Sequence, residues 1–153
     1  MHTPHAILFL GIENARISLL AEAILGYKGE ARFRAYSAGS HPAAAPEADL
    51  IAFLAQHDYR TQHMRTKSWD EFAGEGAPAL DVVVTLHNRL IGEICPVFWT
   101  GRPVSSHWPM PENSMLDECH AILSRRISAL VALPLGELDA VTLQMRLDAI
   151  GRL

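Results

Sequence analysis

Hydrophobic and polar positions follow two different periods along the chain, and each period predicts a different element. Short apolar or alternating segments predict four strands, at 6–10, 32–37, 82–84 and 104–107. Apolar residues at helical spacing predict four helices, at about 17–25, from 46–47 onward, at 116–131 and at about 138–150. Strands that alternate with helices predict an α/β fold with a parallel sheet.

Polar residues, glycines and prolines mark where the predicted helices begin and end. We expect Asn14 to cap the first helix and Gly26 to end it. Pro46 opens the second helix, and Pro134 ends the third. The ligand crevice of such a sheet lies at the carboxyl ends of the strands, which places residues 11–18 at its edge.

Composition is consistent with one globular domain over residues 1–153, of which 49% are hydrophobic and 20% charged. The formal net charge of -4 gives no basic footprint, so neither nucleic acid nor an anionic membrane is an expected partner. Two cysteines cannot build a disulfide framework, and the amino-terminal apolar run is too short for a signal peptide. We therefore expect a cytoplasmic location.

The segment from Gly11 to Ser18 has the outline of a loop that binds phosphate-like anions at a helix N-terminus. Further segments share their order and spacing with one family, namely 21–23 (AEA), 36–42 (YSAGSHP), 65–72 (RTKSWDEF), 81–85 (DVVVT), 92–96 (GEICP), 106–108 (SHW) and 132–135 (ALPL). Together these segments resemble low-molecular-weight protein tyrosine phosphatases and thioredoxin-coupled arsenate reductases. The resemblance implies a three-layer sandwich, with helices on both faces of a four-stranded parallel sheet in the order 2-1-3-4.

The same resemblance implies a set of catalytic positions that this chain fills with other residues. The family's nucleophilic Cys is replaced by Gly11, and its anion-clamping Arg is replaced by Ile17. Glu112 stands where the family has an Asp as general acid, and His87 stands where arsenate reductases have a relay Cys. The candidate ligand-binding residues that remain are those of the loop, Gly11, Ile12, Glu13, Asn14, Ala15, Arg16, Ile17 and Ser18.

Two charged residues of the loop bear on anion binding. Arg16 comes one residue before the clamp position, which rotates it by about 100° around a helix. Glu13 either places a carboxylate among the N–H groups or points to solvent and complements the helix dipole. Family loops often have Gly where Glu13 stands, so we expect positive-φ strain at Glu13 to relax the loop and to weaken oxyanion binding.

Cysteine and histidine give no strong metal or cofactor signal. The pairs His87 with Cys95 and Cys119 with His120 lack the spacing of zinc motifs, so neither a metal nor a cofactor is expected. Cys119 lies on an apolar helix stripe, which predicts a buried side chain, while a disulfide with Cys95 remains an alternative.

Three functions are compatible with this pattern. The first is a non-catalytic relative that acts as a binding or regulatory module, with an unidentified protein or small ligand as its partner. The second is an enzyme, either with residual phosphatase or arsenate reductase activity or with a new reaction built from Glu13, Glu112 and His107. The third is a sensor that binds a small ligand or oxyanion without turning it over.

Overall fold

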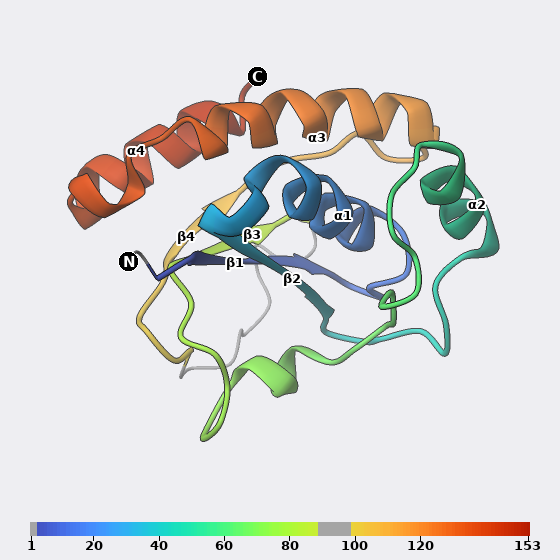
Figure 1. The fold of residues 1–153 in the computed structure, drawn as a ribbon, viewed down its shortest axis with the longest axis horizontal. Helices are drawn as coiled ribbons and strands as arrows, with labels where there is room; N and C mark the ends of the chain where they lie inside the picture. The colour runs from blue at the N-terminus through green and yellow to red at the C-terminus, as the bar shows by residue number, and fades with distance from the viewer. Residues whose placement is uncertain (1–2, 89–98) are drawn as a thin grey trace.

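The computed structural model describes residues 3–88 and 99–153, and its centre is one parallel sheet (Figure 1). The strands are β1 (His5–Gly11), β2 (Phe33–Gly39), β3 (Val82–Thr85) and β4 (Val104–His107). They pair in the order β2-β1-β3-β4, and every pair is parallel. The α/β class and the strand order expected from the sequence are confirmed.

Within the described residues, four α-helices and three short 3-10 helices lie between the strands or follow the last one. The α-helices are α1 (Ile17–Gly29), α2 (Ala48–Gln56), α3 (Leu116–Val131) and α4 (Ala140–Ile150). The described 3-10 helices are η1 (Glu30–Arg32), η2 (Trp69–Phe72) and η4 (Leu135–Glu137). The predicted motif at 92–96, including Cys95, lies outside the described residues.

Both predicted ends of the first helix were wrong. The residue that caps α1 is Arg16, whereas Asn14 lies two residues earlier with a φ of 52°. The side-chain amide of Asn14 forms hydrogen bonds with Ser18 and with the backbone of Lys67, so it does not cap the helix. Gly26 lies inside α1 on its exposed side, because a single glycine costs a helix only about 1 kcal/mol and the buried Leu25 outweighs that cost.

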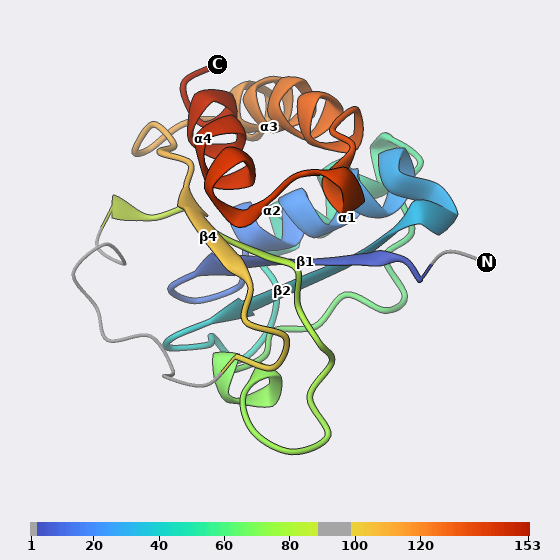
Figure 2. The ribbon, with the colours of Figure 1, turned by 90° about the vertical axis from the view of Figure 1, so that its left-hand side faces the viewer.

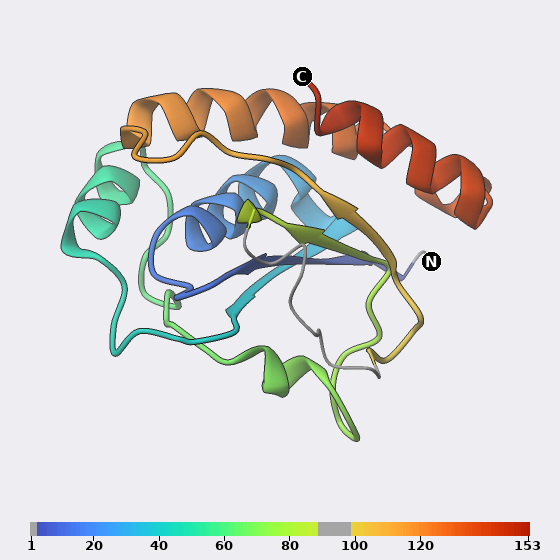
Figure 3. The same cartoon turned by 180° about the vertical axis from the view of Figure 1, so that it is seen from behind.

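The two faces of the sheet are covered differently, as Figures 2 and 3 show. Alternate residues of β1 point to opposite faces, with Ile7 and Phe9 on one side and Leu8 and Leu10 on the other. The buried residues of all four α-helices join the cluster of Ile7 and Phe9. On the opposite face the described cover consists of loops and the 3-10 helix η2, which contributes Phe72. Helices were expected on this face as well, and in the described part of the chain η2 is the helix whose residues pack there.

Trp108, directly after β4, fixes the carboxy-terminal helix to the sheet. Its side chain is fully buried, its ring lies 6.1 Å from that of Phe9, and its Nε1 donates to the carbonyl of Leu147 at 3.0 Å. Gly151 lies so close that an added Cβ would come within 2.8 Å of Trp108 Cδ1.

Among the described residues, no helix has both the length and the apolar character needed to cross a membrane.

Candidate functional site

The loop between β1 and α1 turns its carbonyl groups toward the segment that follows β2. The carbonyl oxygens of Ile12, Glu13 and Ala15 accept hydrogen bonds from the N–H groups of His41, Ala43 and Glu47 at 2.7, 2.9 and 3.0 Å. Within the described residues, the N–H groups of residues 13–16 have no acceptor. The loop thus keeps the unsatisfied N–H groups that an anion-binding helix entrance presents.

Asn14 is the residue that holds this loop in shape. It is 2% exposed, and its Nδ2 donates to Ser18 Oγ at 2.8 Å. Its Oδ1 accepts from the backbone N–H of Lys67 at 3.0 Å. The positive φ of the loop falls on Asn14 and not on Glu13, so the expected strain at Glu13 was wrong. Asparagine tolerates this conformation better than most residues, which removes the reason to expect a relaxed loop.

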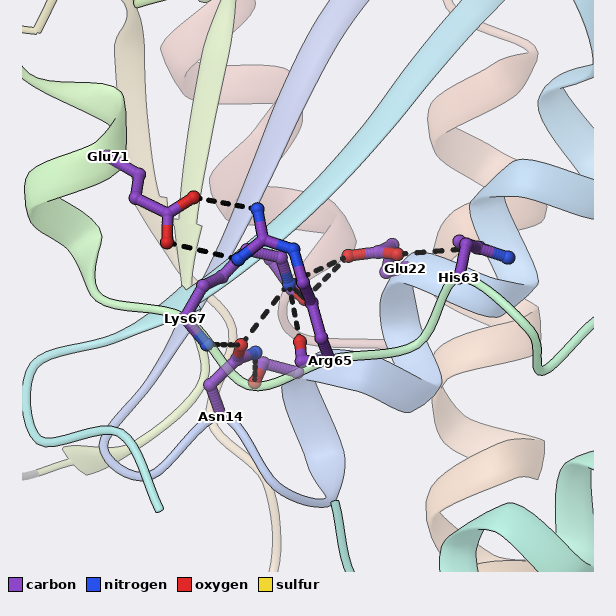
Figure 4. Close-up of polar contacts among 8 residues, drawn as sticks. Asn14, Glu22, His63, Arg65, Lys67 and Glu71 are labelled. Carbon is purple, nitrogen blue, oxygen red and sulfur yellow. Dashed lines mark hydrogen bonds and ion pairs between the residues drawn. The ribbon is translucent and has the colours of Figure 1, made fainter. Parts of the chain in front are cut away.

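The largely buried ammonium group of Lys67 contacts Asn14, as Figure 4 shows. Lys67 Nζ lies 3.3 Å from Asn14 Oδ1, 3.2 Å from Ser37 Oγ and 2.9 Å from the carbonyl oxygen of Arg65. Glu22 Oε1 is 3.5 Å from the same nitrogen. Burial lowers the pKa of Lys67, and the charge of Glu22 opposes that shift. The loop is therefore connected to both α1 and β2 through one cation.

Glu22 completes this cluster from inside α1. It is 7% exposed, accepts a 2.6 Å hydrogen bond from Ser37 Oγ and lies 3.7 Å from Nε2 of His63. No role was predicted from the sequence for Glu22, Ser37 or Lys67, although each lies in a motif that carried the resemblance. The available signal was a glutamate inside the apolar stretch of α1, because an ionised side chain is buried only with a partner.

A cavity of about 650 Å³ opens in front of the loop. Its wall is formed by the loop and by residues far from it in sequence, namely Ile12 to Ser18, Glu47, Leu86, His87, Asn88, Met110 to Ser114 and Cys119. Arg16 Nη2 donates to the carbonyl of Ser114 at 2.7 Å and so joins the loop to the segment before α3. At the family's clamp position the cavity meets the apolar side chain of Ile17.

The structure brings most of the residues singled out in the sequence to this one cavity. His87 and Glu112 line it together with residues 12–18. Gly11 ends β1 just behind it, where an added Cβ would lie 3.0 Å from Ser18 Oγ and 3.5 Å from His87 Cδ2. The positions at which the family has its nucleophile, clamp, acid and relay residue are therefore neighbours in this chain.

Cys119 also borders the cavity, from the first turn of α3. Its side chain is fully buried, as expected, and that burial raises the pKa of its thiol. A raised pKa keeps the sulfur protonated and poorly nucleophilic at neutral pH. No three His, Cys, Asp or Glu side chains of the described part are placed so that they could hold a metal ion.

His107, which the sequence offered as a partner of Glu13 and Glu112, is not among the described residues that line the cavity, but its ring contacts Asn88 of the wall. Its Nδ1 is 2.7 Å from Thr85 Oγ1, and its Nε2 is 3.1 Å from Asn88 Oδ1. Burial and the nearby His87 lower the pKa of His107, which favours the neutral ring. These contacts connect the ends of β3 and β4.

Comparison with known proteins agrees with the loop and the sheet. The sequence model of the low molecular weight phosphotyrosine protein phosphatases matches residues 6–106, so the chain belongs to this family. No curated protein sequence matches the chain significantly.

Solved structures with the same fold come from several organisms. The chain is similar to a thioredoxin-dependent arsenate reductase of Corynebacterium glutamicum (21% identity, TM-score 0.66), covering 85% of this chain and 62% of that one. It is also similar to an arsenate reductase of Archaeoglobus fulgidus (23%, 0.64; 83% and 99% covered). A third relative is Wzb of Vibrio vulnificus in complex with benzylphosphonate (10%, 0.59; 84% and 98% covered). At these identities the likeness establishes the fold alone.

Proposed function

We propose that this chain is a non-catalytic member of its family, which binds a ligand or partner at the cavity without turning it over. The observation that carries the proposal is the pair of residues at the two ends of the loop. Gly11 has no side chain to attack phosphorus or arsenic, and Ile17 has no donor to hold the transferred oxyanion.

The expected loss of turnover without a nucleophile and without a clamping arginine supports the proposal. Removing a covalent nucleophile lowers turnover by about a million-fold, and removing a phosphoryl-clamping Arg lowers it by about a thousand-fold or more. These effects need not multiply, but either alone removes a large part of the catalytic power of the family's site.

None of the other cavity residues supplies the missing chemistry. Cys119 is a buried thiol with a raised pKa, so it is a poor replacement for a thiolate. His87 carries no sulfur for a disulfide relay. Glu112 is an exposed carboxyl that can donate a proton only if another group performs the attack.

The proposal is tested by two assays, hydrolysis of p-nitrophenyl phosphate and thioredoxin-coupled reduction of arsenate. We expect neither rate to exceed that of a buffer control. Turnover that disappears in the Glu112→Ala variant would show a rebuilt catalytic site and would contradict the proposal. Turnover that is insensitive to this change would indicate a contaminating enzyme.

A sensor of a small ligand is the second candidate function. It is favoured by the volume of the cavity, about 650 Å³, which falls in the range that small-molecule sites occupy. Both candidates share one requirement, which is that the cavity binds without chemistry. They differ in whether the occupant is a free molecule or a side chain of another protein.

A further inference from the structure

The charge of the cavity wall has the opposite sign to that of a site for phosphate. Three carboxylates line it, from Glu13 of the loop, Glu47 at the start of α2 and Glu112 before α3. All three side chains belong to exposed residues, so each is open to a ligand that enters the cavity. The three come from segments far apart in sequence, which the fold brings to one cavity.

These carboxylates have no basic partner within the described residues. The ion pairs of that part of the chain engage Glu22, Glu71 and Asp81 and leave out the cavity carboxylates. Arg16, an arginine of the described wall, directs its guanidinium to the carbonyl of Ser114. A divalent oxyanion would therefore face three carboxylates and one guanidinium among the described wall residues, which is a net negative charge. Repulsion between two like charges at about 4 Å amounts to roughly fivefold in affinity in water.

A metal ion does not fit this arrangement. A small cation needs several ligands close together, and no group of three His, Cys, Asp or Glu in the described part is placed to hold one. Carboxylates spread around a cavity of about 650 Å³ suit a larger, organic cation. The wall also offers apolar side chains, those of Ile12, Ile17, Leu86 and Met110.

We propose that the cavity binds a primary ammonium or guanidinium group carried on an apolar stem. The stem lies against the apolar side chains, and the cationic head interacts with Glu13, Glu47 and Glu112. The loop N–H groups remain for a neutral acceptor such as water or a carbonyl oxygen. This inference rests on the proposed function, because it names the ligand of the same non-catalytic site.

Three probes that share one stem test the sign of the charge. We would titrate n-butylammonium, n-butanol and n-butyl phosphate separately into the ¹⁵N-labelled protein and follow the backbone amides of residues 12–18. The ammonium probe is expected to bind at least about tenfold more tightly than the alcohol, and the phosphate probe more weakly than either. Raising the salt concentration should weaken binding of the ammonium probe, because the carboxylates are exposed.

Neutral variants of the wall test the residues. Glu13→Gln, Glu47→Gln and Glu112→Gln should each reduce ammonium affinity by about two- to fivefold and leave alcohol binding unchanged. Glu75→Gln is the matched control, because Glu75 is also exposed but borders a different, shallow hollow beside Trp99. An equal effect of the control would mean that net charge and not the cavity determines affinity, and would overturn the inference.

The source of the cation is resolved by a second pair of ligands. Acetyl-Gly-Lys-Gly-amide is compared with acetyl-Gly-Gln-Gly-amide, and tighter binding of the lysine peptide than of n-butylammonium would identify a protein side chain as the occupant. Tighter binding of n-butyl phosphate, or no binding of any probe, would overturn the inference without restoring catalysis. Hydrolysis of an aryl phosphate would overturn the proposed function instead, so the two failures are distinguishable.

Discussion

Asn14 combines a strained backbone with a satisfied side chain, and both features depend on its being asparagine. Its φ of 52° lies in the left-handed region, which costs most residues about 1 kcal/mol or more. Its amide bridges Ser18 of α1 and the backbone of Lys67. The sequence indicated a special role for Asn14 but assigned it to helix capping, because the alternative requires knowing that the chain around Lys67 returns to the loop.

Replacing Asn14 with alanine should lower the free energy of unfolding by about 2–4 kcal/mol, since it adds backbone strain and leaves buried polar groups without a partner. Asn113→Ala is the control, because Asn113 has a φ of 55° but is exposed. That change should cost only about 1 kcal/mol. Urea denaturation measures both, and equal losses would show that the hydrogen bonds of Asn14 contribute nothing.

His120 should make the protein less stable in mild acid. Burial and, secondarily, the charge of His57 lower the pKa of His120, whose Nε2 lies 2.8 Å from the hydroxyl oxygen of Tyr59. Between that lowered pKa and the ordinary value of about 6.5, the unfolded chain binds more protons than the folded one. The stability that depends on the neutral ring is therefore present above about pH 6.5 and is lost as the pH falls through the lowered pKa.

The matching experiment measures the free energy of unfolding from pH 7.5 to 5 in wild type, His120→Gln and His41→Gln. Glutamine keeps an acceptor for Tyr59, so the first variant should show a flatter dependence on pH than wild type. His41 is exposed and serves as the control for the loss of an imidazole. Identical slopes in wild type and in His120→Gln would contradict the prediction.

At the scale of elements, hydrophobic periodicity was sufficient for the strands and helices but not for all their ends. The apolar run after His5 and the three valines of β3 are buried in the sheet, as continuous apolar runs predict. Gly26 shows why a local sequence signal can fail to predict the end of a helix. Gly26 carries the sequence signature of a helix end, yet α1 continues to Gly29, because packing outweighs the local preference of one residue.

Replacement by alanine should change the free energy of unfolding in opposite directions at two glycines. At Gly26 an added Cβ meets nothing within 4 Å, so Gly26→Ala should raise the free energy of unfolding by about 0.5–1 kcal/mol. At Gly151 the added Cβ would lie 2.8 Å from Trp108 Cδ1 and 3.0 Å from the carbonyl oxygen of His107. Gly151→Ala should therefore cost about 1–3 kcal/mol. Thermal unfolding of both variants checks the prediction, and a gain in stability at Gly151 would contradict it.

At the scale of the whole molecule, the sheet and the loop follow from the sequence, whereas the cavity does not. Gly11, Ile17, His87 and Glu112 were identified through the family resemblance, and they gather at one end of the sheet. Glu47 was expected only as the start of a helix, and its place in the cavity wall depends on the crossing of the segment after β2 over the loop. Contacts of this kind join distant segments and leave no periodic signal in a single sequence.

The loop between β1 and α1 keeps its place at the end of the sheet, which implies that oxyanion binding can be restored with few changes. We expect calorimetry to show that the wild type binds phosphate or arsenate only in the millimolar range or not at all. The variant Gly11→Cys, Glu13→Gly, Ile17→Arg should bind at least about tenfold more tightly, because it removes one repulsion of roughly 1 kcal/mol and adds a charge-assisted donor worth about 1.5–3 kcal/mol. Ile17 already borders the cavity, and a Cβ at position 11 requires only a small shift of Ser18.

Gly11→Cys alone is the control, since it restores the thiol and leaves Glu13 and Ile17 of the wall in place. It should bind phosphate no better than the wild type. Tight oxyanion binding by the wild type would identify the chain as an oxyanion sensor. Failure of the triple variant to bind would show that the N–H groups of residues 13–16 do not converge on one point, so that the loop has lost its anion geometry as well as its catalytic side chains.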